Sequence, residues 1–76
     1  MSDATLDARG LICPLPILRA RKALGALKPG QTLEVLATDP GAIPDFEAFC
    51  RTSGHELVEA GSTGGEHRVL IRAKKT

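Results

Sequence analysis

The chain has 76 residues, of which 42% are hydrophobic and 25% are charged, as expected for one small globular domain over residues 1–76. Its formal net charge of +1 creates no overall field that would draw it to a nucleic acid or a membrane. Two Phe, with no Tyr or Trp, leave almost no aromatic surface for stacking bases, and no apolar run approaches the roughly 20 residues that cross a bilayer. The first residues lack the basic and apolar parts of an export signal, so we expect a cytoplasmic protein with reduced cysteines.

Glycines and prolines divide the chain into predicted elements. Residues 4–8 predict a short strand. From residue 14 to residue 27 apolar side chains recur at helical spacing, and this predicts an amphipathic helix that Pro29-Gly30 ends. Residues 32–38 alternate between apolar and polar side chains and predict a half-buried strand, although Leu36 falls on the polar side.

A second helix is predicted after the pair Asp39-Pro40, which is typical of a cap followed by a first-turn proline. This helix begins at Pro40 or near Ile43-Pro44, and Gly54 is placed to end it in the left-handed conformation. Its narrow apolar face comprises Phe46, Phe49 and Cys50.

Two further strands, over residues 56–60 and 67–73, flank the loop 61–65, whose glycines we interpret as turn residues. The predicted order is β-α-β-α-β-β. Right-handed crossovers would place both helices on one face of a four-stranded mixed sheet. The predicted fold class is therefore α/β (α+β), a two-layer sandwich with the second face of the sheet exposed.

Cys13 is the residue that best suggests chemistry, because it stands where a loop turns into the first helix. Pro14 suits the first helical position, which would put the Cys13 sulfur at the positive end of the helix dipole. Helix N-termini and cationic neighbours lower the pKa of a thiol from about 8.5, and residues 8–33 contain no acidic side chain. We therefore expect a nucleophilic thiolate, the alternative being a small apolar residue in a turn.

The prolines around Cys13 restrict the backbone rather than donate hydrogen bonds. Pro14 and Pro16 hold φ near −65° and have no amide hydrogen, which leaves Leu15 and Ile17 as the expected donors at this helix end. A lone thiolate without a base, a metal or an enclosed pocket favours a covalent carrier. Cys13 would accept a sulfur atom as a persulfide and pass it to a cysteine of another protein.

The remaining cysteine and the histidines are weaker candidates. Cys50 shares the apolar face of the second helix and is predicted to be structural. His55 is predicted at a solvated cap position, and His67 could act as a general base, although nothing places it near Cys13. Without Cys-x-x-Cys or a zinc-ligand spacing, we expect neither a dithiol cycle nor a metal site.

The charges are unevenly distributed, since residues 1–30 carry a net positive charge and residues 31–66 a net negative one. Such polarity suits oriented docking of a partner, although chance clustering on a solvated surface is the alternative. The candidate docking residues are Arg9, Arg19 and Lys22 around Cys13, and Asp39 and Asp45 as a second group.

The segment Leu6–Pro16 resembles the N-terminal signature of the TusA/SirA-like family, whose hallmark is Cys-Pro-x-Pro. The resemblance continues through Lys28–Gly30, Ala37–Pro40, Asp45-Phe46 and Gly54–Leu57. It implies a βαβαββ fold and a cytoplasmic sulfurtransferase-type carrier, rather than a self-contained turnover enzyme. The persulfide on Cys13 would be its functional group, with no other cofactor.

The same resemblance implies partners. A cysteine desulfurase or a rhodanese would donate the sulfur and a DsrE-like protein would accept it, in tRNA 2-thiouridine synthesis, in sulfur oxidation, or in molybdenum-cofactor or selenium handling. Two alternatives from other classes are a non-catalytic RNA-binding or regulatory module of the same fold, and a monothiol redox or peroxide sensor. The neutral net charge and missing aromatics argue against direct nucleic-acid binding.

Overall fold

The computed structural model describes residues 3–12 and 14–74. In chain order its elements are β1 (Ala4–Ala8), α1 (Leu15–Gly25), β2 (Thr32–Ala37), α2 (Ala42–Ser53), β3 (Glu56–Thr63) and β4 (Glu66–Arg72). The predicted order β-α-β-α-β-β is confirmed. None of the helices in the described part of the chain is long and apolar enough to cross a membrane.

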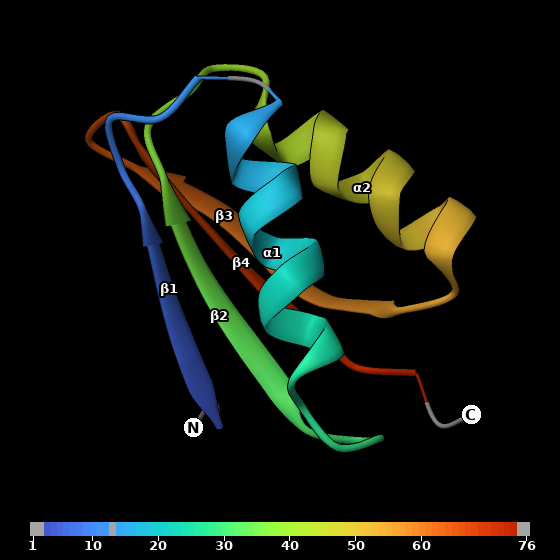
Figure 1. Ribbon diagram of the computed structural model, residues 1–76. Coiled ribbons are helices and arrows are strands. Elements are labelled where there is room, and N and C mark those ends of the chain that lie inside the picture. The colour runs from blue at the N-terminus through green and yellow to red at the C-terminus, as the bar shows by residue number, and fades with distance from the viewer. Residues whose placement is uncertain (1–2, 13, 75–76) are drawn as a thin grey trace.

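The four strands form one mixed sheet in the order β1-β2-β4-β3. β1 and β2 are parallel, because α1 returns the chain to the end from which β1 started, whereas β4 is antiparallel to both β2 and β3. Both helices cover the same face of this sheet, and the other face carries no helix (Figure 1). The predicted two-layer sandwich is therefore confirmed.

The core lies between the sheet and the two helices. Burial alternates strictly along β2, where Leu33, Val35 and Ala37 face the helices, as the period of two in a strand requires. α1 contributes Ala20 and Leu24, which are buried as the helical spacing predicts. The other fully or nearly buried apolar side chains include Phe46, Phe49, Cys50, Val69 and Ile71.

The start of α2 differs from the prediction. Gly41, and not Asp39, is the N-cap, and no side chain caps the helix. Asp39 instead uses its backbone carbonyl, which accepts a hydrogen bond from the Ala42 amide at 3.0 Å. The pair Asp39-Pro40 therefore lies in the connection before α2. A backbone hydrogen bond, and not the Asp39 side chain, forms the turn that leads into this helix.

The β3–β4 hairpin is longer and tighter than predicted. Only Gly64 and Gly65 form the turn, and their φ angles of 58° and 84° are the positive values that a two-residue type I′ hairpin requires. Gly61 lies within β3 and pairs with Arg68. The loop predicted over residues 61–65 was therefore wrong, since cross-strand pairing extends β3 through a polar and glycine-containing stretch.

His55 differs from the predicted solvated cap. Gly54 ends α2 in the left-handed conformation (φ 86°), as predicted. The half-buried ring of His55 then lies 5.8 Å from the ring of Phe49, and its Nδ1 accepts a hydrogen bond from the Lys74 amide at 3.0 Å. Desolvation, followed by the charge of Lys74, lowers the pKa of His55 below its ordinary value of 6.5.

This environment predicts a pH-dependent stability. Because the folded state disfavours protonation of His55, its contribution to the free energy of unfolding is present above the unfolded pKa of 6.5. That contribution is lost as the pH falls from there through the lower folded pKa. We expect denaturant titrations between pH 8 and pH 5 to show a larger loss of stability in the wild type than in His55→Gln. Equal losses in the two proteins would contradict this prediction.

Candidate functional site

Cys13 lies outside the residues that the structure describes, but the chain on both sides of it is described. Residues 9–12 leave the end of β1, and Pro14 leads into α1. Since β1 and β2 are parallel, the connection after β1 and the connection after β2 meet at the same end of the sheet (Figure 1). The structure thus places the neighbours of Cys13 at the end of the sheet that also carries the start of α2.

The N-terminus of α1 is formed differently in detail from the prediction. Pro14 is the N-cap residue (φ −98°, ψ 16°) rather than the first helical residue, and the buried Pro16 occupies the second helical position. The Leu15 amide donates to the Ile12 carbonyl at 2.9 Å, so it is not the free donor that we expected. Ile17 is third in the helix, a position whose amide has no carbonyl partner within the helix.

The first turn of α1 decides part of the electrostatic character of this helix end. No side chain caps α1, and its first turn contains no acidic residue. The positive end of the dipole therefore has no carboxylate of its own first turn to compensate it. An anion next to this end, such as a thiolate or a persulfide, would be stabilised.

Backbone and side-chain hydrogen bonds hold the loop that precedes Cys13. The Gly10 amide donates to Oγ1 of Thr38 at 2.9 Å, and the Leu11 amide donates to the Ala8 carbonyl at 3.2 Å. Gly10 itself has a φ of 83°, which glycine adopts without the strain that a side chain would add. This loop is consequently tied to the residue that follows β2.

Arg9, predicted to help dock a partner, is engaged in ion pairs. Its Nε and Nη2 lie 2.9 and 3.0 Å from the carboxylate oxygens of Asp7, and its Nη1 lies 3.6 Å from Glu66. The pairing lowers the pKa of Asp7 to about 2, chiefly through the hydrogen bond from the Arg9 side chain, and raises the pKa of Arg9. Two carboxylates thus offset its charge locally, and a docking role for Arg9 stays a prediction.

Arg19 and Lys22 border a shallow groove of about 680 Å³ between α1 and β1. We call it the α1–β1 groove, and its lining residues are Leu6, Leu15, Leu18, Arg19, Lys22, Ala23 and Ala26. Leu15 and Leu18 are 41% and 49% exposed, so this groove combines accessible apolar side chains with two cations. Leu18 was not predicted as part of this surface, although the helical spacing places it outside the buried face of α1.

Asp39 and Asp45 lie near each other at the start of α2, where their carboxylates both approach Gly41. Asp45 also lines a smaller groove of about 320 Å³ between the two helices, and the other lining residues are Pro14, Ile17, Arg21, Ala48, Phe49 and Thr52. The predicted basic and acidic docking residues are therefore not brought together. Arg19 and Lys22 border the α1–β1 groove, whereas Asp45 borders the groove between α1 and α2.

Cys50 is a core residue, as predicted. Its side chain is 5% exposed, and burial raises the pKa of its thiol to about 11. A thiol in this environment is almost entirely protonated near neutral pH and is a poor nucleophile.

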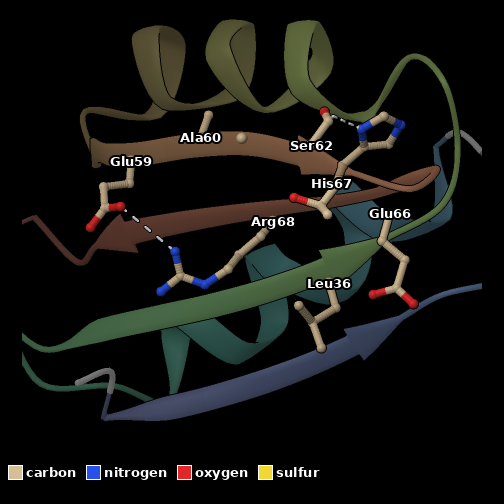
Figure 2. A pocket seen from close by; sticks show the side chains of 9 residues that line it. Leu36, Glu59, Ala60, Ser62, Glu66, His67 and Arg68 are labelled. Atoms are coloured by element: carbon tan, nitrogen blue, oxygen red, sulfur yellow. Dashed lines mark hydrogen bonds and ion pairs between the residues drawn. The ribbon is translucent and has the colours of Figure 1, made fainter.

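His67 lies at a hollow of about 590 Å³ that borders the helix-free face of the sheet (Figure 2). Its Nδ1 is 2.6 Å from Oγ of Ser62, and the Arg68 guanidinium in the same hollow pairs with Glu34 and Glu59. The histidine is thus engaged with the β3–β4 hairpin. Within residues 3–12 and 14–74, no group of three or more His, Cys, Asp or Glu side chains is arranged to hold a metal ion.

Comparison with known proteins identifies the family. A family model described as sulfurtransferase TusA matches residues 4–73. The sulfur carrier protein TusA of Allochromatium vinosum is 54% identical over 70 residues, or 92% of each chain. A SirA-like protein from Desulfitobacterium hafniense has a similar structure, with a TM-score of 0.82, 30% sequence identity, and coverage of 95% of this chain and 99% of that one. With its fold and nearly its whole length matched, the chain belongs to the TusA family of sulfur carriers.

Proposed function

We propose that this protein is a cytoplasmic sulfur carrier that holds sulfur as a persulfide on Cys13 and passes it from one protein to another. The observation that carries the proposal is the position of Cys13 directly before the N-cap of α1, a helix with no acidic residue in its first turn. The family supports the transfer of sulfur, and the buried, protonated Cys50 is poorly suited to it.

The proposed transfer balances without an external oxidant or reductant. The Cys13 thiolate attacks the outer sulfur of a donor persulfide, forming a new S–S bond on Cys13 while the donor's S–S bond breaks. The donor cysteine leaves as a thiolate, and the proton of its persulfide remains with the transferred sulfur. An acceptor thiolate then attacks the outer sulfur on Cys13 in the same way and regenerates the Cys13 thiolate.

The donor that we propose is a cysteine desulfurase or a rhodanese, and the acceptor is a DsrE-like protein. The grooves of the described residues are open and lie on the surface, which suits contact with another protein better than enclosure of a small substrate. The relay would serve tRNA 2-thiouridine synthesis or sulfur oxidation, and the donor that loads the protein faster would indicate which.

Intact-mass spectrometry tests the proposal. The protein is incubated with a cysteine desulfurase and cysteine, or with a rhodanese and thiosulfate, and we expect a gain of roughly 32 Da that dithiothreitol removes. Loading by neither donor, with the protein folded and Cys13 reduced, would contradict the proposed function. RNA binding that falls steeply with salt and survives the loss of Cys13 would instead support the RNA-binding alternative.

The α1–β1 groove predicts how a partner docks. We expect an acidic and apolar partner surface next to the donor cysteine, because Arg19 and Lys22 flank the exposed Leu15 and Leu18. Arg19→Glu with Lys22→Glu should slow sulfur transfer from the donor by tenfold or more at low salt, on the order of the effect of steering charges. High salt should reduce the difference.

A matched control separates docking from chemistry. Arg51→Glu reverses an exposed charge in the last turn of α2 and should leave the transfer rate nearly unchanged. Alkylation of Cys13 by neutral iodoacetamide should be similar in all these variants. A transfer rate that does not respond to the double reversal would place the docking surface elsewhere, with Asp39 and Asp45 as the next candidates.

A further inference from the structure

The loop of residues 9–12 is held by side chains from β1, from β4 and from the residue that follows β2. Asp7 comes from β1, Thr38 follows β2, and Glu66 begins β4. All of them contact Arg9 or Gly10, the residues at the start of the loop. We call Asp7, Arg9, Thr38 and Glu66 the loop clasp.

The contacts of the clasp act on both the side chain and the backbone of the loop. Oδ1 of Asp7 accepts hydrogen bonds from the backbone amide of Arg9 at 3.1 Å and from its Nε at 2.9 Å. Oγ1 of Thr38 accepts one from the Gly10 amide at 2.9 Å. The Asp7 carboxylate therefore holds both the backbone and the guanidinium of Arg9. This restricts the conformation of the first turn after β1.

The pair between Arg9 and Glu66 connects the loop to the far side of β2. In the sheet order, β2 separates β1 from β4, so the Arg9 side chain reaches past the β2 strand to meet Glu66 at 3.6 Å. Figure 2 shows Glu66 and Leu36, a residue of β2, beside each other on the helix-free side of the sheet. The β3–β4 hairpin is thereby linked to the loop that leads to Cys13.

The clasp is poorly explained as a device for overall stability. Its side chains are largely exposed, with Arg9, Asp7 and Glu66 between 46% and 59% accessible, and exposed ion pairs contribute little to the free energy of unfolding. These ion pairs can, however, restrict the conformation of a local segment of the chain. The segment they restrict ends one residue before Cys13.

We propose that Thr38 and the Asp7–Arg9–Glu66 ion pairs are positioning groups that hold residues 9–12 in one conformation and thereby present Cys13 to its partners. This proposal rests on the proposed sulfur-carrier function and assigns the clasp no contact with the transferred sulfur. Its role is to reduce the number of orientations that the nucleophile samples before attack, which is a recognised source of rate.

Two variants separate positioning from simple electrostatics. Thr38→Val removes the acceptor of the Gly10 amide without changing any charge, so an electrostatic role predicts no effect on the reactivity of Cys13. Glu66→Gln removes a negative charge, which by electrostatics alone would favour the Cys13 thiolate and accelerate its reactions. Positioning predicts slower transfer for both variants, which differs from the electrostatic expectation in each case.

The experiment measures the rate of persulfide transfer to and from Cys13 and the pH profile of its alkylation by iodoacetamide, read by mass spectrometry of the Cys13 peptide. We expect Thr38→Val and Glu66→Gln each to slow transfer by about threefold to tenfold, the effect of one lost hydrogen bond or ion pair. Thr38→Ser, which keeps the hydroxyl, should restore the rate. Amide hydrogen exchange at Gly10 should accelerate in Thr38→Val only.

The helix-free face of the sheet offers matched controls. Glu56→Gln breaks the pair between Glu56 and Arg72 (2.9 Å), and Thr5→Val removes a hydroxyl that contacts Glu34. These are the same two kinds of substitution as in the clasp, Glu to Gln and Thr to Val, but they leave the contacts of the clasp intact. We therefore expect the transfer rate and the pH profile to be unchanged.

The outcomes are distinguishable. Faster exchange at Gly10 in Thr38→Val with an unchanged transfer rate and pH profile would overturn the positioning role, as would acceleration of transfer by Glu66→Gln. If the wild type accepts no sulfur from any donor, the proposed function fails, and the alkylation rates of Cys13 in Thr38→Val and Thr38→Ser still decide whether the clasp positions the thiol.

Discussion

We expect sulfur loading to fall to background in the Cys13→Ser variant and to match the wild type in the Cys50→Ala variant. A serine hydroxyl cannot form a persulfide and is not ionised near neutral pH, so the substitution removes the reacting atom. Cys50 is 5% exposed and burial raises its pKa to about 11, and a donor protein cannot reach a thiol inside the core. The measurement is the mass gain after incubation with the sulfur donor.

Circular dichroism provides the necessary control, because both variants must retain the fold for the comparison to count. Alanine suits position 50 since it leaves no unpaired hydroxyl among the apolar side chains there. Loading that persists in Cys13→Ser, or that disappears in a folded Cys50→Ala, would show that Cys13 is not the residue that holds the sulfur. Either result would contradict the proposed mechanism.

The second large effect concerns the core. Phe46 has no exposed surface and meets Phe49 edge to face, with the ring centroids 6.4 Å apart. We expect Phe46→Ala to cost about 3–5 kcal/mol, because it removes buried surface and leaves a cavity. A small domain has a total stability of roughly 5–15 kcal/mol, so the variant should lose a large fraction of its stability and populate the unfolded state more often.

Denaturant titration followed by circular dichroism measures this loss. Leu18→Ala is the matched control, since Leu18 is 49% exposed and its truncation should change the free energy of unfolding by less than about 0.5 kcal/mol. A loss of stability for Phe46→Ala no larger than for Leu18→Ala would contradict the packing described for the core.

Much of the fold could be predicted because its signals are local. The alternation in residues 32–38 and the helical spacing from residue 14 to residue 27 depend on near neighbours in the chain, and each repeats the period of its secondary structure. Gly54 ended α2 as predicted for the same reason, since a left-handed residue after a helix is a local requirement. The prediction that Cys13 lies just before a helix rests on the same kind of signal.

The errors arose where contacts with another strand or with the C-terminal segment outweighed the local preference of the chain. Gly61 and Ser62 do not favour a strand, yet cross-strand pairing with residues 66–68 extends β3 through Thr63. Likewise, His55 follows a helix end that is usually solvated, but the C-terminal segment returns and places the Lys74 amide against its ring.

The sequence by itself determined the kind and order of the elements and the buried faces of the helices, because each depends on a period or a cap within a few residues. The prediction that Cys13 rather than Cys50 carries the sulfur rests on equally local signals. The tertiary structure alone decided that Arg9 meets Glu66, that Thr38 holds Gly10, and that Leu15 and Leu18 border a groove with two cations. These contacts join segments that the order of strands in the sheet brings together. No local pattern encodes them, because a side chain's partner across the sheet depends on where the whole chain has folded.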